Sequence, residues 1–473
     1  MASHPLGSEA RPLRVAVVGS GPSAFYAIEA LFKAADLSCR VDVFDRLPTP
    51  YGLVRGGVAP DHQKIKSVVR VYEKTAAQPG FRFFGNVALG RDVLVDDLTA
   101  HYDRIIYGFG NESDRRLGIP GEELAGVHAA TAFVGWYNGH PDFQGEQFDL
   151  ERATRVAVVG NGNVAMDVAR LLVRSPDELA ETDIADAALD VLRQSKVREV
   201  VLLGRRGPAQ AAFSPKEIEE VGGLAGVNLV VPPQEIALDE LSAQWLEGDA
   251  PRSAGRNVSY LRKQSEAGAD ATTRQVRCRF LVSPVEFVGD GDRVTAVRLQ
   301  RNELVAGDDG EPRPKAVDSY DEEPVDLVFK AIGYRGDPVP GVPHDARRGI
   351  VPNRDGRVLD APDGSVVPGQ YVVGWAKRGP TGLIGTNSPD SKLTVEALLQ
   401  DIAGVEAEAL DAADAERVPA LLRSRGVDAV SFADWEALDR HEIEAGRARG
   451  KARSKLSSVD EMLAAIREAR SAQ

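Results

Sequence analysis

Two short apolar runs with the same six residues stand out in the hydrophobic pattern of the chain. Arg14-Val-Ala-Val-Val-Gly19 and Arg155-Val-Ala-Val-Val-Gly160 are rich in β-branched residues and end in glycine. Such runs are typical of parallel strands that are buried on both faces. Behind each glycine-rich turn, apolar residues return at helical spacing, within residues 24–31 and 164–172. The repeat predicts two separate dinucleotide-binding folds.

Other β-branched and aromatic runs predict the remaining strands, at residues 41–44, 104–107, 199–203 and 327–332. Residues 280–299 hold two β-rich runs around Gly289-Asp-Gly-Asp292, which predicts an antiparallel hairpin. Surface loops are expected at residues 265–273 and in the acidic segment 306–323, and a surface helix within 175–196. From Ser391 onward the Ala/Glu/Arg-rich pattern predicts helices, including a weakly amphipathic tail.

The expected domain boundaries follow from two predicted strands that close in glycine, near Gly110 and Gly333. We expect an α/β protein with two Rossmann-like dinucleotide-binding domains, the second inserted in the first. Residues 1–111 would begin the first domain, 112–334 would form the second, and 335–473 would complete the first and add the helical tail. For hydride transfer, the two phosphate-binding turns would have to face each other.

The first glycine-rich turn, Gly19-Ser-Gly21-Pro-Ser23-Ala24, matches the GxGxxG/A fingerprint of dinucleotide sites. Gly19 permits the tight turn, Gly21 lets a diphosphate approach the backbone, and Ala24 lets the helix pack on the strand. The helix start adds unpaired N–H groups and a partial positive charge. Asp45 ends the next strand, where its carboxylate can accept hydrogen bonds from the ribose hydroxyls. A glycine turn without a ligand is the weaker alternative.

The second turn, Gly160-Asn161-Gly162-Asn163-Val164-Ala165, repeats the fingerprint, so a second diphosphate is expected at Asn163 and Val164. Here the strand that corresponds to the ribose-binding one is followed by Arg205 and Arg206 and by no acid. Guanidinium groups bind a 2′-phosphate through paired charge-assisted bonds, whereas a carboxylate would repel it. A bare arginine pair would more simply be solvated, but this position favours phosphate binding and predicts a preference for NADPH over NADH.

Composition narrows the function classes. The chain has 473 residues, 43% of them hydrophobic and 27% charged, as in ordinary globular proteins. A net charge of -14 argues against nucleic-acid binding, which requires a surplus of Lys and Arg. The two cysteines, Cys39 and Cys278, supply neither a CxxC redox pair nor a metal cluster and are expected to be packing residues. We expect no membrane span, no secretory signal and a cytoplasmic location.

Several longer motifs resemble the adrenodoxin reductase family of ferredoxin–NADP reductases, from about Arg14 to Leu399. The matching segments are Tyr51-Gly-Leu-Val-Arg-Gly-Gly-Val-Ala-Pro-Asp-His62, Gly160-Asn-Gly-Asn-Val-Ala-Met-Asp167, Gly204-Arg-Arg-Gly-Pro-Ala-Gln-Ala-Ala-Phe213, Ala331-Ile-Gly-Tyr-Arg-Gly336 and Gly374-Trp-Ala-Lys-Arg-Gly-Pro-Thr-Gly-Leu-Ile-Gly-Thr-Asn387. Two departures are Ala24 in place of a third glycine, and Asp45 where a longer Glu is common.

The resemblance implies which residues hold the cofactors. It assigns FAD to the first domain, at Ser23, Asp45, Leu53, Leu89, Trp375, Gly382, Leu383 and Ile384. It assigns the nicotinamide nucleotide to the inserted domain, at Asn161, Gly162, Asn163, Val164, Arg205, Arg206 and Glu217, together with Gly382. The glycines of the late segment also permit close approach to a flat ring, and Trp375 offers a stacking surface.

Three titratable residues match positions near the flavin and nicotinamide in that family: His62, Asp167 and Glu217. His62 begins an apparent helix, whose positive end would keep the imidazole neutral so that it could polarise a ring or relay a proton. A simple hydrogen bond at the helix start is an equally good interpretation of His62. Asp167 lies on the same helix face as Asn163, and Glu217 could accept a hydrogen bond from the nicotinamide amide.

The resemblance implies a ferredoxin–NADP reductase, in which hydride passes from NADPH to FAD and single electrons pass to an iron–sulfur protein such as ferredoxin. A disulfide reductase would need a cysteine pair. A flavin monooxygenase is a nearer rival, although the partial signature from Phe133 to His140 is interpreted as chance. An electron-input subunit of a larger complex and a dinucleotide sensor without turnover also remain open.

Overall fold

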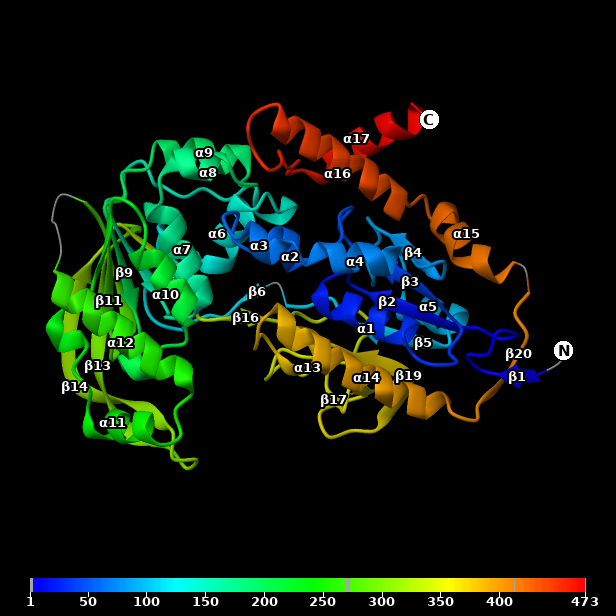
Figure 1. Ribbon diagram of the computed structural model, residues 1–473, viewed down its shortest axis with the longest axis horizontal. Helices are drawn as coiled ribbons and strands as arrows, with labels where there is room; N and C mark the ends of the chain where they lie inside the picture. Colours follow the sequence, from blue (N-terminus) through cyan, green and yellow to red (C-terminus); the bar gives the residue numbers. More distant parts are fainter. Residues whose placement is uncertain (1–2, 112, 269–272, 412, 473) are drawn as a thin grey trace. The chain divides into compact units, whose positions relative to one another are not determined.

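The computed structural model describes residues 3–111, 113–268, 273–411 and 413–472 (Figure 1). The chain folds into two compact units. Unit 1 consists of Met1–Ser113 and Gly333–Gln473, and unit 2 consists of Asp114–Ile332. Unit 2 is therefore inserted in unit 1. The chain passes from unit 1 to unit 2 between Ser113 and Asp114 and returns between Ile332 and Gly333.

Unit 1 is built on a seven-stranded sheet with the order β17-β18-β19-β5-β2-β3-β4. Its parallel part consists of β2 (Leu13–Val18), β3 (Cys39–Phe44), β4 (Phe81–Phe84), β5 (Arg104–Tyr107) and β19 (Val366–Val372). Antiparallel strands β17 (Asn353–Arg354) and β18 (Arg357–Leu359) extend it. Separate two-stranded sheets pair β1 (Ser3–Pro5) with β20 (Glu406–Glu408), and β6 (Ser113–Asp114) with β16 (Tyr334–Arg335).

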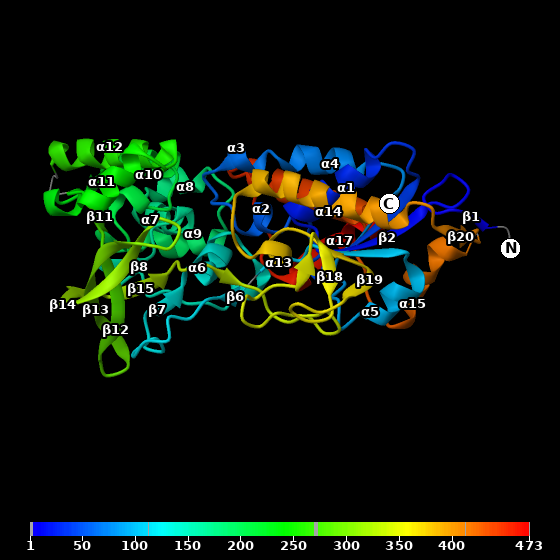
Figure 2. The same ribbon diagram turned by 90° about the horizontal axis from the view of Figure 1, so that it is seen from below.

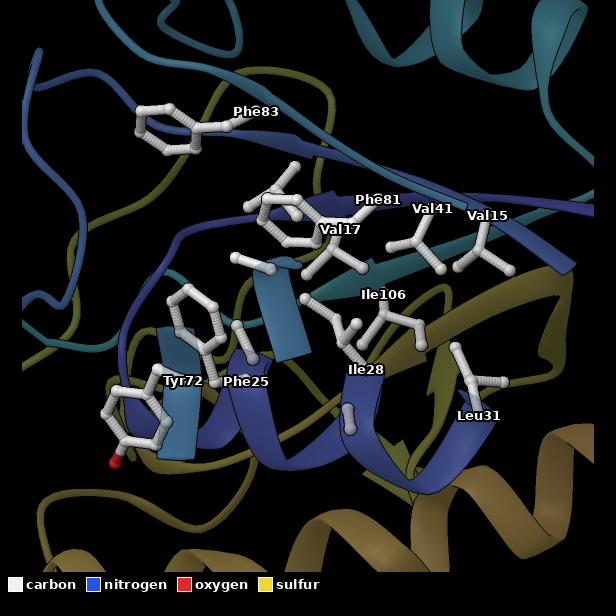
Figure 3. Close-up of a cluster of buried hydrophobic side chains, with 14 of the residues drawn as sticks. Val15, Val17, Phe25, Ile28, Leu31, Val41, Tyr72, Phe81, Phe83 and Ile106 are labelled. Carbon is white, nitrogen blue, oxygen red and sulfur yellow. The ribbon is translucent and has the colours of Figure 1, made fainter. Parts of the chain in front are cut away.

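Side chains of the central strand alternate between two apolar layers, as strand geometry requires. Val15 and Val17 of β2 are fully buried and face Phe25 and Ile28 of helix α1 (Pro22–Phe32), as Figure 3 shows. Ala16 belongs to the layer on the other face. Burying a valine or isoleucine side chain stabilises a fold by about 1.5–3 kcal/mol. This packing fixes α1, and with it the turn that precedes α1.

The remaining helices of unit 1 cover both faces of its sheet. The layer around Val17 includes α4 (Val69–Ala76), α14 (Asn387–Ile402), α16 (Phe432–Arg447) and α17 (Val459–Ser471). The opposite layer includes α5 (Val95–His101) and α15 (Arg417–Ser424). Helix α14 packs along α1, which both views show (Figures 1 and 2). Short helices are α2 (Leu53–Gly56), α3 (Gln63–Lys66) and α13 (Trp375–Arg378).

Unit 2 contains a six-stranded parallel sheet with the order β10-β11-β9-β8-β15-β7. Its strands are β7 (Val127–Ala129), β8 (Arg155–Val159), β9 (Glu199–Leu203), β10 (Val227–Val230), β11 (Arg274–Arg279) and β15 (Leu327–Lys330). Its helices are α6 (Ala130–Tyr137), α7 (Asn163–Val173), α8 (Pro176–Ala180), α9 (Asp186–Arg193), α10 (Pro215–Gly222), α11 (Glu240–Glu247) and α12 (Arg252–Ala267). Both Rossmann-like folds predicted from the repeat are confirmed.

A three-stranded antiparallel sheet covers one face of that parallel sheet (Figure 2). It consists of β12 (Val282–Asp290), β13 (Arg293–Ala306) and β14 (Pro312–Pro324). The predicted hairpin is β12–β13. The expectation of a surface loop over 306–323 is wrong, because most of it is β14, paired with β13 along its length. Its acids are partners of neighbouring strands: Glu323 accepts hydrogen bonds from Arg277 at 2.7 Å and Arg279 at 2.9 Å.

The structure confirms some of the remaining predictions for helices and loops and corrects others. Segment 175–196 forms two helices, α8 and α9, that bury Leu179, Leu189 and Leu192, so it packs more deeply than the expected surface helix. In the expected loop 265–273, residues 265–267 complete α12, and residues 269–272 lie outside the described residues. The predicted C-terminal helices are confirmed as α14 to α17. Within the described part of the chain, no helix is long and apolar enough to cross a membrane.

Candidate cofactor-binding sites

The predicted FAD residues gather at the carboxyl edge of the unit 1 sheet. Strands β2, β3, β5 and β19 are parallel, so the residues that follow them meet at one edge. These residues are Gly19 after β2, Asp45 after β3, Gly108 after β5 and Gly374 after β19. Ala24 lies under this edge, because a Cβ atom on Gly108 would lie 3.2 Å from the Ala24 Cβ atom. This is the ligand edge of open α/β sheets.

The two glycines of the first turn have different physical tasks. Gly19 has φ 94°, and a Cβ atom there would lie 2.6 Å from the backbone oxygen of Gly108, so no other residue fits. Gly21 has φ -80°, and a Cβ atom there would point into open space. Helix α1 begins directly after it, and no side chain of the described residues caps the helix start. The open approach and uncapped N–H groups fit a diphosphate.

Asp45 is partly committed to the turn itself, which the sequence did not reveal. One carboxylate oxygen accepts hydrogen bonds from the Ser20 backbone N–H at 3.0 Å and from the Ser20 hydroxyl. The other accepts the Leu47 N–H at 2.9 Å. Burial raises the pKa of Asp45 above its usual value, although these hydrogen bonds oppose the shift. Asp45 thus braces the turn with its short side chain, and its contact with a ribose stays a prediction.

The segment Tyr51–Leu53 lies against the phosphate-binding turn. The Tyr51 N–H donates to the Ser20 carbonyl at 2.9 Å, and a Cβ atom on Gly52 would lie 3.1 Å from the Gly21 Cα atom. Leu53 is half-buried and begins α2. Leu89 is half-buried in the apolar layer that contains Phe44 and Tyr107. Both leucines therefore belong to unit 1 at or near its ligand edge, as a role in FAD binding requires.

The late glycine-rich loop joins this edge through α1. Gly374 has φ 68° and packs directly against Ser23, whose carbonyl accepts a hydrogen bond from the Ser391 hydroxyl at 2.9 Å. The Trp375 ring is tilted by 44° against that of Tyr334, with ring centroids 5.2 Å apart. Its Nε1–H donates to the Thr381 carbonyl at 3.2 Å. Two apolar side chains of this loop differ in exposure: Leu383 is 64% exposed, whereas Ile384 is half-buried. Gly382, which precedes them, has φ 81°.

Arg378 braces the same loop and was not expected from the sequence. Its guanidinium donates to the Thr381 carbonyl at 2.8 Å and to the Asn387 side-chain oxygen at 2.7 Å. Because Asn387 begins α14, these bonds tie the exposed loop to a helix that is packed on α1. The sequence Lys377-Arg378-Gly379 gives no pattern from which this role could have been predicted.

The second fingerprint occupies the equivalent edge of unit 2. Gly160 has φ 129°, and a Cβ atom there would collide with the Ala331 carbonyl, whereas a Cβ atom on Gly162 would meet open space. Asn163 begins α7, and its side-chain oxygen accepts the Ser214 N–H at 2.8 Å. The Asn161 amide nitrogen is buried with no hydrogen-bond partner among the described residues. Open access beside an unsatisfied donor fits a nucleotide diphosphate.

The arginine pair that follows β9 has guanidinium groups available for a ligand. Arg205 is exposed and Arg206 is half-buried. Neither guanidinium has a hydrogen bond or ion pair to a residue in the described ranges. Their backbone is held instead, since the Arg205 carbonyl accepts the Asn302 amide at 3.0 Å and the Arg206 carbonyl accepts the Leu281 N–H at 3.1 Å. Because the backbone is fixed and both guanidinium groups are available to a ligand, the arginine pair is suited to binding a 2′-phosphate.

A buried arginine links Asp167 and Glu217, two of the three titratable residues that the family resemblance places near the flavin and nicotinamide as candidate catalytic residues. Arg170 is 1% exposed and donates to Asp167 at 2.7 Å and to Glu217 at 3.1 Å. It therefore connects α7 to α10 and fixes the two carboxylates. Arg170 was not expected from the sequence, although Asp167 and Arg170 have the i, i+3 spacing of a helical ion pair.

His62 belongs to unit 1, is 8% exposed and precedes α3, and its side chain does not cap that helix.

Replacing Arg170 with methionine is expected to destabilise the protein by about 3–5 kcal/mol, because two largely buried carboxylates lose their cation. Urea denaturation monitored by circular dichroism measures the change in the free energy of unfolding. Arg193→Met is the matched control, since the Arg193–Asp190 pair is also helical but solvent-exposed, and a change of less than about 1 kcal/mol is expected there. Equal losses in both variants would contradict the role assigned to Arg170.

Comparisons with known proteins agree with two nucleotide sites. The model of the pyridine nucleotide-disulphide oxidoreductase family matches residues 13–206. The chain is 46% identical to the NADPH-ferredoxin reductase FprA of Mycobacterium tuberculosis, over 96% of this chain and 99% of that protein. It is 42% identical to mitochondrial NADPH:adrenodoxin oxidoreductase of Homo sapiens, over 97% and 93%. The solved structure of Mycobacterium tuberculosis FprA in complex with NADPH matches with a TM-score of 0.90 and 44% identity, covering 96% of this chain and 100% of that one.

The cysteines do not fit the disulfide chemistry in the name of the matched family model. Cys39 lies in unit 1 and Cys278 in unit 2, and both are free. Burial raises the pKa of the Cys39 thiol to about 11 and that of the Cys278 thiol to about 12. Both thiols therefore stay protonated near neutral pH, and neither is a nucleophile there. Cys278 is a core residue as expected, whereas Cys39 is half-buried.

Proposed function

The chain belongs to the adrenodoxin reductase family of NADPH–ferredoxin reductases, and on that premise we propose that it carries electrons from NADPH through FAD to a ferredoxin-type iron–sulfur protein. The single observation that carries this proposal is the presence of two dinucleotide edges, one in each unit. Each has a first glycine with positive φ, where a Cβ atom would collide with the end of a neighbouring strand, and an unobstructed second glycine at a helix start.

Unit 1 is proposed to hold FAD. Its diphosphate would lie at Gly21 and Ser23, its ribose near Asp45, and its ring system against the segments that contain Leu53 and Trp375. Bound FAD supplies the conversion of a two-electron hydride into single electrons, which nicotinamide alone does not provide. The protein's share is to orient the ring, exclude water from it and leave one edge accessible.

Unit 2 is proposed to hold NADPH as the electron donor. Gly162 and the start of α7 would bind its diphosphate, and Arg205 and Arg206 would bind its 2′-phosphate. Glu217, held by Arg170, would accept a hydrogen bond from the nicotinamide amide and select the ring face that is presented. Asp167 shares the same cation, so we assign it a positioning role. His62 would polarise a ring or relay a proton from unit 1.

The rival activities have less support among the described residues. The segment from Phe133 to Tyr137 is a buried helix, in which Phe133 packs on Phe148 and Phe329, so it serves the core of unit 2 and not a monooxygenase site. An electron-input subunit and a sensor without turnover are distinguished from a reductase by enzymatic assay. A cytoplasmic location completes the proposal and is checked by cell fractionation.

Purified protein is expected to be yellow and to oxidise NADPH with ferricyanide. It is also expected to reduce cytochrome c only when a ferredoxin is added, because the iron–sulfur protein relays the electrons. Stopped-flow absorbance at the flavin band separates reduction by NADPH from reoxidation by ferredoxin. Bound flavin without NADPH oxidation would indicate a sensor. Oxygen consumption that depends on an organic substrate would indicate a monooxygenase and refute the proposal.

A further inference from the structure

The C-terminal tail holds a fully buried carboxylate that no part of the proposed reaction uses. Glu442 lies on α16 and is 0% exposed. A buried charge is strongly unfavourable unless it is paired and hydrogen-bonded. Its partners therefore show what the tail is built to contact.

The main partner of Glu442 is an arginine on α2, nearly 400 residues earlier in the chain. Both Glu442 oxygens accept hydrogen bonds from Arg55, at 2.8 and 2.6 Å, in the paired geometry that suits a carboxylate. Arg453 adds a bond at 3.1 Å and the Leu456 N–H adds one at 3.0 Å. Burial alone would raise the pKa of Glu442, but the charges of Arg55 and Arg453 hold it below its usual value.

The C-terminal tail also contacts Tyr51 and the backbone of Arg55. Trp435, about two turns before Glu442 on α16, lies under the Arg55 guanidinium, with 5.2 Å between the ring centroid and the guanidinium carbon. The edge of the same indole meets Tyr51, with centroids 5.8 Å apart at 86°. The Lys455 ammonium donates to the Arg55 carbonyl at 3.2 Å. Side chains from α16 and the following loop thus hold three points of segment 51–55.

That segment has a strained backbone where it meets the phosphate-binding turn. Tyr51 has φ 82°, a left-handed value that is rare for a bulky residue and persists only when the surroundings enforce it. Gly52 follows with φ 48° and lies against Gly21. Because Leu53 is the next residue, any relaxation of Tyr51 would shift both Gly52 and a predicted FAD contact.

We propose that Glu442 is a positioning residue for FAD: through Arg55 it keeps the Tyr51–Leu53 backbone in the conformation that receives the cofactor. This inference rests on the proposed function, because it requires unit 1 to bind FAD. Without the clamp, the apoprotein populates relaxed conformations of segment 51–53. The apparent affinity for FAD then falls in proportion to the remaining fraction of competent molecules.

The test is FAD binding to apoprotein of the Glu442→Gln variant, which keeps the side-chain shape and removes the charge. We expect the Kd for FAD to rise about tenfold or more, measured by quenching of flavin fluorescence. The difference in Tm between holoprotein and apoprotein is expected to shrink, and the flavin midpoint potential to shift. Arg470→Gln is the matched control: Arg470 pairs with Asp434 and Asp428 within the tail, and its Kd for FAD should match wild type.

Two results would overturn the inference. An unchanged Kd for FAD in Glu442→Gln, with equal losses of Tm in apoprotein and holoprotein, would make Glu442 a purely structural residue. An equal rise of Kd in Arg470→Gln would make the effect a general one of the tail. Should Glu442→Gln fail to fold, Arg55→Lys keeps the charge and loses the paired geometry, and an unchanged Kd there counts equally against the clamp. Wild-type protein that binds no FAD would instead refute the proposed function.

Discussion

Replacement of both Arg205 and Arg206 with alanine is expected to raise the KM for NADPH about 100-fold and to leave the KM for NADH nearly unchanged. The two guanidinium groups have no partner among the described residues, so their loss should not disturb the fold. Two charge-assisted contacts to a phosphate contribute together about 3 kcal/mol, which is roughly a factor of 100. Steady-state kinetics with both nucleotides, using ferricyanide as acceptor, measures the two KM values.

The comparison of nucleotides is the internal control of that experiment, because NADH lacks only the 2′-phosphate. The Tm of the double variant should stay within about 2 °C of wild type, as surface substitutions have small effects. Equal losses with NADPH and NADH would mean that the arginines act on a shared part of the nucleotide. No loss with either would place the 2′-phosphate elsewhere.

Gly21→Val is expected to give a folded, colourless protein. The φ angle of Gly21 is -80°, which valine can adopt, and its side chain would meet no protein atom within 4 Å of the Cβ position. The new methyl groups would occupy the path of the diphosphate, so we expect the Kd for FAD to rise roughly 100-fold or more. Far-ultraviolet circular dichroism checks the fold, and absorbance near 450 nm checks the flavin content.

Gly19→Val is the informative contrast. Gly19 has φ 94°, and its Cβ atom would lie 2.6 Å from the backbone of Gly108 and Phe109. Valine at this position should therefore damage the fold itself and reduce the yield of soluble protein. A yellow Gly21→Val protein with normal affinity for FAD would contradict the placement of the diphosphate at this turn.

Much of the architecture could be predicted from the sequence, because the position of a strand or turn in the fold dictates which residues it can contain. The runs that begin at Arg14 and Arg155 are central parallel strands, apolar on both faces, and this environment leaves a strong mark on the sequence. The glycine fingerprints are equally visible, since Gly19 and Gly160 each need a positive φ and lack room for a side chain. Each crossing between the units comes a few residues after a buried strand, β5 or β15, and close to a glycine with positive φ, Gly110 or Gly333.

The features that could not be predicted depend on distant partners. Strand β14 is rich in acids, which is typical of a loop, but Asp321 and Glu323 face arginines that come from β11. The sequence reveals an acid, Asp45, at the position expected for a ribose contact. It does not reveal the hydrogen bonds that Asp45 accepts from Ser20 and Leu47, because these form only in the folded turn. Arg170, Arg378 and Glu442 are single charged residues whose partners lie on other elements. No local pattern distinguishes them from solvated charges.

The insertion of unit 2 imposes an order on synthesis. Residues 114–332 are contiguous and contain every strand of their parallel sheet, so this part can fold as soon as it leaves the ribosome. The first 113 residues must wait, because β19, which pairs with β5 in the interior of their sheet, is made only after the insertion. Until then the edge of β5 is unpaired and prone to association with other chains. Chaperone dependence and aggregation should therefore concentrate in nascent chains that end before residue 372.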